Sequence, residues 1–155
     1  LAMRHSDRAL ALNPNFVNAM VSRGFLEAYT GKPALGADIL VKAFALDPHR
    51  PDYDYELLAE SYYLMRDYER AVEIYARWRN PPPHMYAQLA ACHAQLGHLD
   101  EARAAVETFH EKRPKDSDFD FYAAAHARLC LRPEDAEHWM DGYRKAGLLR
   151  KTSSA

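Results

Sequence analysis

The chain has 155 residues and a formal net charge of −2, with 48% hydrophobic and 27% charged residues. This composition excludes a disordered segment, and a chain of this length buries enough surface to fold without disulfides or a metal. No apolar run approaches the ~20 residues that span a bilayer, and the first residues lack the apolar stretch of a signal peptide. The balanced charge provides no basic surface for nucleic acid. Two cysteines without metal spacing, Cys92 and Cys130, indicate a reducing, cytoplasmic setting.

Apolar residues recur at intervals of three and four along the chain, and no run alternates with a period of two. Between residues 85 and 96, for example, Tyr86, Leu89, His93 and Leu96 form one stripe of a 3.6-residue helix. We therefore predict an all-α fold. The predicted helices cover residues 2–12, 17–30, 34–46, 53–65, 68–79, 84–96, 99–112, 118–130 and 134–146.

Small residues recur at a nearly constant interval, which indicates an internal repeat. They follow one another at 34, 35, 31 and 34 residues, in the order Ala2, Gly36, Ala71, Ala102 and Ala136. Pro14 and Pro48 keep the same 34-residue spacing. The pattern predicts a single solenoid domain over 1–149, made of a half-repeat (1–16) and four repeats (17–50, 51–82, 83–116 and 117–149), with a flexible tail at 150–155.

Residues that start and stop helices lie at the expected boundaries. Pro33 and Pro133 suit the first position of a helix, where the missing N–H costs nothing. The acidic run 116–120 suits a helix start, since side-chain oxygens and negative charge are favourable there. Gly31, Gly97 and Gly147 stand where helices end in a left-handed residue. Pro81-Pro82-Pro83 cannot lie inside a helix, so the preceding helix is expected to stop near Arg79.

The repeat resembles the tetratricopeptide repeat (TPR), a helix–turn–helix of 34 residues. In repeat 17–50 the signature offsets are occupied by Met20, Arg23, Gly24, Gly36, Leu40, Ala43 and Pro48, although Arg23 and Gly36 depart from the usual residue types. The resemblance covers residues 2–147 and implies a right-handed superhelix whose concave surface binds a protein or peptide. Gly36 is then expected to be small because two helices cross closely there.

A narrower resemblance concerns the parent protein. The runs 43–53, 86–97, 100–105 and 132–148 are similar to the C-terminal repeat region of bacterial class III adenylate/guanylate cyclases and of related winged-helix regulators. This implies that a catalytic or DNA-binding domain precedes the chain, which would itself be a regulatory or scaffolding segment and not an enzyme. Residues 1–13 read as a second helix without a first, which agrees with a longer parent; the alternative is a capping helix. A stand-alone adaptor or an oligomerisation domain also remains open.

No constellation of residues indicates catalysis, a cofactor or a metal. Cys92 and His93 are adjacent, so on a helix they point about 100° apart, and no second pair has zinc spacing. The run 116–120 begins like a calcium loop, but Phe121 and Ala127 stand where that loop needs Gly and Glu. There is no glycine-rich phosphate loop and no nucleophile motif. We expect no enzyme activity from this chain.

The TPR resemblance also implies which residues line the concave groove, since the first helix of each repeat provides them. The predicted binding residues are Asn18, Val21, Phe25, Tyr53, Glu56, Glu60, Tyr63, His84, Phe121 and Arg128. Glu56 and Glu60 would favour a basic or neutral segment, and Ala87, Ala91 and Ala94 leave room for a bulky side chain or a helix. The partner would be a protein, a peptide, another domain of the same polypeptide or a second copy. Alternatively, the groove is solvated or filled by a neighbouring segment of the array.

Overall fold

The computed structural model describes residues 2–149, so the predicted tail at 150–155 lies outside the described residues. This part of the chain contains nine α-helices and no β-strand, which confirms the all-α prediction. Contacts between Cα atoms group the chain into two compact units, Leu1–Ile74 (unit 1) and Tyr75–Ala155 (unit 2). The boundary falls inside the repeat predicted at 51–82.

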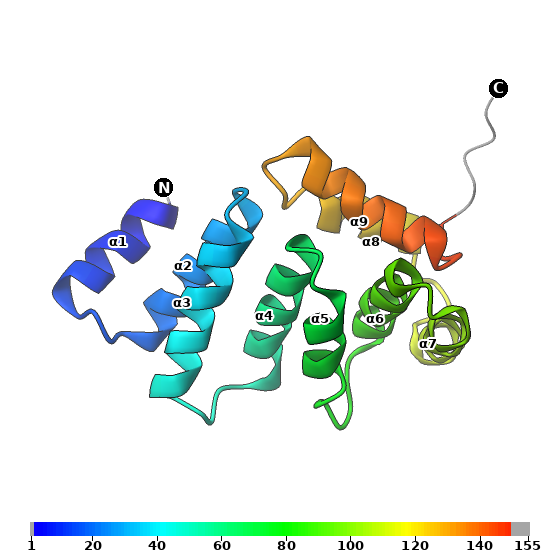
Figure 1. Ribbon diagram of the computed structural model, residues 1–155, viewed down its shortest axis with the longest axis horizontal. Coiled ribbons are helices and arrows are strands. Elements are labelled where there is room, and N and C mark those ends of the chain that lie inside the picture. The colour runs from blue at the N-terminus through cyan, green and yellow to red at the C-terminus, as the bar shows by residue number, and fades with distance from the viewer. Residues whose placement is uncertain (1, 150–155) are drawn as a thin grey trace. The chain divides into compact units, whose positions relative to one another are not determined.

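Unit 1 is a stack of helices in which neighbours along the chain are neighbours in space. Helix α3 packs against α2 and α4, α2 also contacts α4, and α1 packs against α2 (Figure 1). We call α2, α4, α6 and α8 first helices and the others second helices, by their place in the predicted repeats. The helices of unit 1 are α1 (Ala2–Leu12), α2 (Val17–Tyr29), α3 (Pro33–Leu46), α4 (Asp52–Leu64) and α5 (Tyr68–Tyr75).

Two glycines allow α2 and α3 to cross at close range. A Cβ atom on Gly36 would lie 2.6 Å from the carbonyl oxygen of Gly24 and 2.9 Å from the Cβ of Ala28. A Cβ atom on Gly24 would lie 2.6 Å from the Cγ of Leu40. Real Cβ atoms do not approach other atoms so closely, because such overlap is strongly repulsive. The prediction of a close helix crossing at Gly36 is confirmed.

Charged side chains tie α2 to its neighbours in unit 1. The Arg23 Nε donates to the Glu27 carboxylate over 2.8 Å, and Arg23 also pairs with Asp7 of α1. Arg50 Nε donates to the buried Asp54 over 2.6 Å, and its Nη1 donates to Asn18 Oδ1 over 2.8 Å. The pairs that Arg23 and Arg50 form with buried Glu27 and Asp54 offset the cost of burying these two carboxylates.

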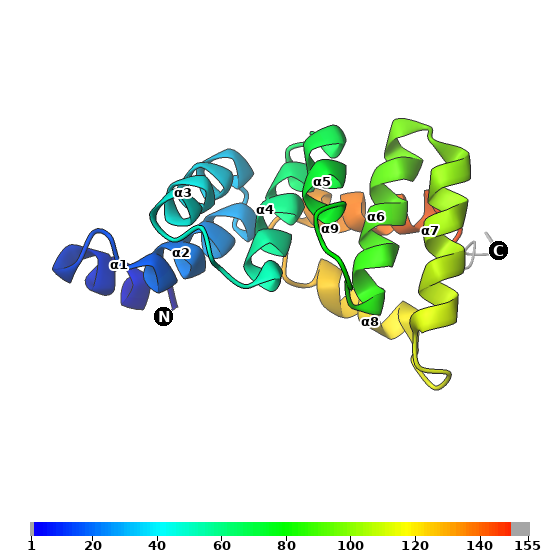
Figure 2. The ribbon, with the colours of Figure 1, turned by 90° about the horizontal axis from the view of Figure 1, so that it is seen from below.

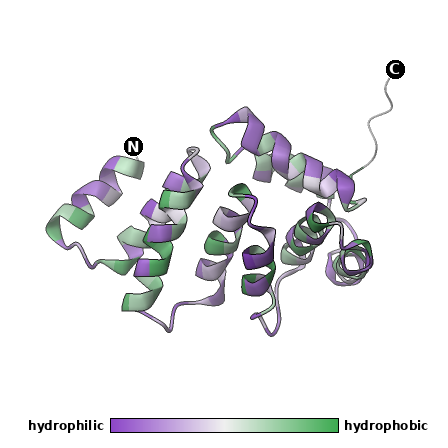
Figure 3. Cartoon of the chain, in the orientation of Figure 1, coloured by the Kyte–Doolittle hydropathy of each residue, from purple (hydrophilic) through white to green (hydrophobic). Residues whose placement is uncertain are grey.

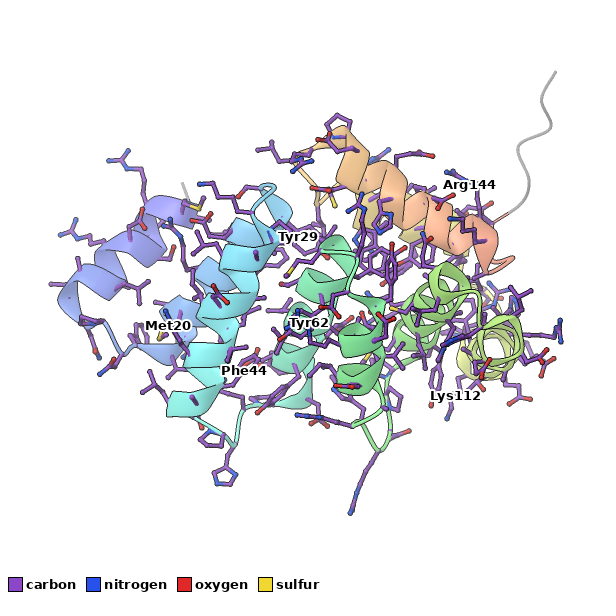
Figure 4. The ribbon with its side chains drawn as sticks, viewed as in Figure 1. Met20, Tyr29, Phe44, Tyr62, Lys112 and Arg144 are labelled. Atoms are coloured by element: carbon purple, nitrogen blue, oxygen red, sulfur yellow. The ribbon has the colours of Figure 1, made fainter. Side chains whose placement is uncertain are left out.

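Aromatic contacts complete the packing of unit 1. The rings of Phe44 and Tyr55 have centroids 4.4 Å apart, and the Arg70 guanidinium lies over the ring of Tyr62 at 4.3 Å. Figure 4 labels Phe44 on α3 and Tyr62 on α4. Each pair joins a helix to the next segment of the chain, as expected for a linear stack.

Unit 2 begins with a regular hairpin and ends with an irregular one. Helices α6 and α7 pack side by side, with Gly97 at φ 76° closing the intervening turn (Figure 2). Helix α9 packs against α8 and against α6, which it crosses at a steep angle (Figure 2). The helices of unit 2 are α6 (Pro83–Leu96), α7 (Leu99–Lys112), α8 (Phe119–Ala127) and α9 (Pro133–Lys145).

The core of the α8–α9 hairpin is aromatic. Trp139 and Tyr143 of α9 are fully buried. The His126 ring of α8 lies 4.5 Å from the Trp139 ring, and its Nδ1 forms a 2.8 Å hydrogen bond with the Tyr143 hydroxyl. Phe119 packs edge-on against Tyr143 at 5.2 Å. Large aromatic side chains fill this core, whereas glycine and alanine side by side form the α2–α3 crossing of unit 1.

Most helix boundaries agree with the prediction to within one residue, and two helices are shorter. Helix α5 ends at Tyr75 and not near Arg79. Trp78 instead closes a turn onto the Tyr75 carbonyl, and the prolines that follow offer no N–H to extend the helix. Helix α8 ends at Ala127, three residues early, because Arg128 begins the loop to α9. No helix in residues 2–149 combines the length and the hydropathy needed to cross a bilayer.

Candidate functional site

The predicted groove residues of unit 1 lie on α2 and α4, and some of them are accessible. Tyr53 is 61% exposed, and Asn18 is also exposed. Phe25 is half-buried, with its ring 4.9 Å from that of Tyr29, and Glu56 is half-buried too. These four residues offer an aromatic, amide and carboxylate surface that a partner can contact without any rearrangement of the chain.

Three predicted binding residues of unit 1 lie in the interior. Val21 is 7% exposed, Glu60 is 6% exposed and Tyr63 is fully buried, with its ring 5.4 Å from that of Tyr68. They cannot contact a partner unless neighbouring elements move. The predicted acidic patch of Glu56 and Glu60 is therefore reduced at the surface to Glu56. Sequence offsets identify the groove side of a helix but not the depth of each side chain.

In unit 2 the predicted groove face of α6 is covered. Ala87 and Ala91 are fully buried and Ala94 is 7% exposed. Residues at this spacing share one helical face with Gln95. Helix α9 packs against α6, and Gln95 contacts α9 directly. We infer that α9, a helix of the chain itself, covers this face at least near Gln95, where the small side chains of α6 leave room for it.

Polar contacts fix the position of α9 on α6. Gln95 Nε2 donates to Asp141 Oδ2 over 3.0 Å, and Lys145 Nζ donates to Gln95 Oε1 over 2.8 Å. Lys145 also pairs with Asp141 at 2.8 Å. The Lys145 ammonium lowers the pKa of the Asp141 carboxyl, and the Gln95 amide adds to the effect, while partial burial opposes it. Beyond this triad the outer side of α9 is largely hydrophilic (Figure 3).

The predicted binding residues of α8 and the start of α6 have different surroundings. Phe121 is 71% exposed, and Arg128 at the end of α8 is also exposed. The His84 ring of α6 lies 5.8 Å from the Tyr122 ring of α8, beside a cavity of about 230 Å³ that Phe109, Arg113 and Phe119 also line. Phe121 therefore offers an accessible apolar side chain on unit 2.

The structure places the candidate metal and calcium residues in structural roles. Cys92 is fully buried, and burial raises the pKa of its thiol well above its usual value. Burial lowers the pKa of the His93 imidazole. Within residues 2–149 no three histidine, cysteine or acidic side chains come together as metal ligands would. Asp118 caps α8 by accepting a hydrogen bond from the Phe121 backbone N–H over 3.1 Å, which confirms the predicted helix start.

Sequence reasoning did not identify the residues that join α9 to the rest of unit 2. Gln95 and Asp141 were not among the predicted site residues, although the hydrogen bond between their side chains joins α6 to α9. Trp139 and Tyr143, four residues apart, offered a signal: two large aromatic groups on one face of a helix indicate a heavily buried face. The pattern did not say which surface that face covers.

The fold is a TPR-like helical repeat. Residues 37–109 match the family model "Anaphase-promoting complex, cyclosome, subunit 3". This segment runs from α3 to α7 and excludes the α8–α9 hairpin. No curated protein is similar enough in sequence to be counted as a relative.

Solved structures share the fold over nearly the whole chain. One described as "Crystal structure of MamA" has a TM-score of 0.66 at 18% identity, with 93% of this chain and 84% of that chain covered. Another, "Crystal structure of MamA protein", has a TM-score of 0.65 at 19% identity, with 94% of this chain and 79% of that chain covered. At this identity the likeness establishes the fold and does not transfer a partner.

Proposed function

We propose that the chain is a non-catalytic interaction module that binds a helical segment of a partner protein through the faces of its first helices. Repeat proteins of this architecture use such faces as extended binding surfaces. The observation that carries the proposal is that Tyr53 of α4 and Phe121 of α8, both on first helices, are 61% and 71% exposed. A helical partner is proposed because the first helix α6 already packs against a helix of the chain itself, α9.

The accessible residues on the other first helices extend this proposal. Tyr53 on α4 and Phe121 on α8 are exposed aromatic side chains, the residue class that carries much of the energy at protein interfaces. Exposed Asn18 on α2 and half-buried Glu56 on α4 supply polar groups in unit 1. A partner helix with apolar residues on one face, and basic or neutral residues at its edge, matches this chemistry.

Site-specific photo-crosslinking in source cells tests the proposal. A benzophenone amino acid replaces Tyr53 on α4 or Phe121 on α8, and matched controls place it at Val41 on α3 or Leu99 on α7, which are 47% and 62% exposed. The proposal predicts that one partner protein is crosslinked from the first-helix positions and not from the second-helix controls. Equal crosslinking from all four positions, or none from Tyr53 and Phe121, would contradict it.

We further propose that the module serves a larger bacterial signalling protein in the cytoplasm, with a class III adenylate/guanylate cyclase as the first candidate. The support is the resemblance of the runs 43–53, 86–97, 100–105 and 132–148. Immunopurification from source cells, followed by intact mass and N-terminal peptide analysis, tests this. A much larger polypeptide with a catalytic or winged-helix domain is expected. A polypeptide of about the present size would refute it and leave a stand-alone adaptor or an oligomerisation domain.

A further inference from the structure

An aromatic cavity of about 230 Å³ lies at one end of unit 2. It is found where the start of α6, the end of α7 and the start of α8 meet (Figure 2). Four rings line it, those of His84, Phe109, Phe119 and Tyr122. Phe109 and Phe119 are buried, whereas His84 and Tyr122 are half-buried. Exposed Asp118 also lines the cavity, so solvent reaches it from this side.

The rings of this cavity form a connected cluster. Phe109 and Phe119 pack edge to face with centroids 4.9 Å apart. The Phe119 ring stacks on that of Tyr122 at 5.6 Å, and the His84 ring follows at 5.8 Å from Tyr122. Aromatic rings attract one another at centroid separations of about 4.5–7 Å. A planar aromatic ring is therefore the group that these walls match best.

A guanidinium without an acidic partner stands at the same cavity. Half-buried Arg113 lies with its guanidinium 5.5 Å from the centre of the Phe109 ring, and its Nη1 donates to the Ser117 carbonyl oxygen over 3.2 Å. No acidic side chain within residues 2–149 pairs with it. Since a guanidinium has five N–H donors, Arg113 retains donors for a ligand.

Arg113 differs in this respect from the other arginines of residues 75–149. Three of them pair with acidic side chains, namely Arg103, Arg132 and Arg144. The remaining three are exposed to solvent, namely Arg77, Arg79 and Arg128. Arg113 alone in this part of the chain is half-buried without a carboxylate, which favours an anionic group in the cavity.

Asp118 limits the charge that the ligand can carry. Its Oδ1 accepts a hydrogen bond from the Phe121 backbone N–H over 3.1 Å, so this carboxylate caps α8 and does not pair with Arg113. Its negative charge nevertheless opposes an anion nearby. One guanidinium and one carboxylate at the same cavity favour a ligand with a single negative charge. A carboxylate meets this condition better than a phosphate monoester, whose charge approaches about −2.

We propose that this cavity binds a small aromatic carboxylic acid. The ring of the ligand packs among Phe119, Tyr122 and His84, and its carboxylate accepts hydrogen bonds from Arg113. A mostly apolar lining with a few polar groups that fix orientation is typical of small-molecule sites. The cavity is separate from the partner-binding residues of the first helices, because Phe121 does not line it.

Amide NMR of the ¹⁵N-labelled whole chain, titrated with indole-3-acetate, tests the inference. Indole-3-acetamide is the matched ligand, with the same ring and no charge. The acid is expected to saturate the chain with a Kd of about 1 mM or lower, as its size allows. It should bind about tenfold more tightly than the amide, because the amide loses a charge-assisted hydrogen bond. The largest signal shifts should fall within residues 109–122.

Variants of the chain test the role of each group. With Arg113→Gln the acid should bind no more tightly than the amide, whereas Arg103→Gln, on the same helix but outside the cavity, should keep the tenfold preference. Asp118→Asn retains a good helix cap and should tighten acid binding about twofold without affecting the amide. Tyr122→Ala should weaken both ligands alike. Circular dichroism confirms that each variant stays folded.

Three results would overturn the inference. The first is that the acid causes no saturable shift of signals from residues 109–122. The second is that acid and amide bind the wild-type chain equally well. The third is a preference for the acid that survives in folded Arg113→Gln, which would mean adventitious binding elsewhere. None of these results bears on crosslinking from Tyr53 or Phe121, so the two proposals fail separately.

Discussion

Units 1 and 2 pack their helices together with different kinds of side chain. In unit 1, Gly24 and Gly36 let α2 and α3 approach closely, and the helices stack in chain order. In unit 2, α9 crosses α6 and buries Trp139 and Tyr143 in the hairpin that it forms with α8. Small residues at a helix crossing let neighbouring helices pack closely in chain order, whereas large aromatic residues need more space between the helices. The alanine face of α6 provides space for such a helix.

This difference has a functional consequence. The first helix α4 of unit 1 keeps Tyr53 at the surface, whereas the alanine face of the first helix α6 in unit 2 is already occupied. The alternative raised from sequence, that a neighbouring segment fills the groove, holds for this face of α6. Any partner helix that uses the alanine face must compete with α9.

Trp139→Ala should cause the largest loss of stability, because it empties the centre of the α8–α9 hairpin. Removing a fully buried tryptophan side chain costs about 3–5 kcal/mol in unfolding free energy. Urea unfolding followed by circular dichroism measures the loss. Leu131→Ala, at a residue that is 72% exposed, is the control and should stay within about 0.5 kcal/mol of wild type. An equal loss of unfolding free energy in both variants would mean that the aromatic core does not stabilise unit 2.

Gly36→Leu tests the corresponding feature of unit 1. Its Cβ atom alone would meet the Gly24 carbonyl and Ala28, so the helices must separate, at a cost of about 1–3 kcal/mol or somewhat more. The melting temperature should fall. Ala34→Leu on the exposed side of the same helix should leave it nearly unchanged. An unaltered melting temperature for Gly36→Leu would show that the close crossing is not needed.

Tyr143→Phe tests the polar contact in the core of unit 2, because it removes one hydroxyl group and keeps the aromatic ring. The buried His126 Nδ1 loses the 2.8 Å hydrogen bond from this residue, and leaving a buried polar group without such a partner costs about 1–3 kcal/mol. Tyr53→Phe, at an exposed position, serves as the matched control. Equal unfolding free energies for the two variants would mean that the hydrogen bond contributes nothing to unit 2.

Asp141→Asn should have the smallest effect, and the effect should depend on pH. Because Lys145 lowers the pKa of Asp141 in the folded chain, the ionised carboxylate adds stability above its unfolded pKa of about 3.9. That contribution is lost as the pH falls through the lower, folded pKa. The gap between wild type and variant in urea midpoint should therefore be present at pH 7 and shrink in acid. Asp38→Asn, on the exposed side of α3, is the control, and a gap that widens in acid would contradict the assignment.

The sequence predicted local structure well because local signals are strong. Pro33 and Pro133 begin helices, Asp118 caps α8, and Gly97 ends α6 in a left-handed conformation, all as expected. Each of these outcomes depends on backbone geometry within a few residues. Arg66, with φ 64°, adopts at the end of α4 the left-handed conformation that glycine usually adopts there.

The sequence did not predict which surfaces of the site are open. Periodicity placed Tyr63 and Tyr53 on the same helix with similar roles, yet one is fully buried and the other is 61% exposed. It also assigned α9 to an ordinary repeat, while the structure shows α9 in contact with α6 through Gln95, Asp141 and Lys145. Burial and helix crossing arise from tertiary packing, which spacing alone does not encode.

The position of α9 on α6 is tested most directly by zero-length crosslinking. Gln95→Glu, in an Asp141→Asn background, places a carboxylate beside Lys145, whose Nζ lies 2.8 Å from Gln95 Oε1. Carbodiimide treatment and peptide mass spectrometry should then find an amide bond between residues 95 and 145. In wild type the same reagent should join Asp141 to Lys145, which are 2.8 Å apart, and so verifies the reaction. If that local bond forms and the 95–145 bond does not, α9 does not occupy the alanine face of α6.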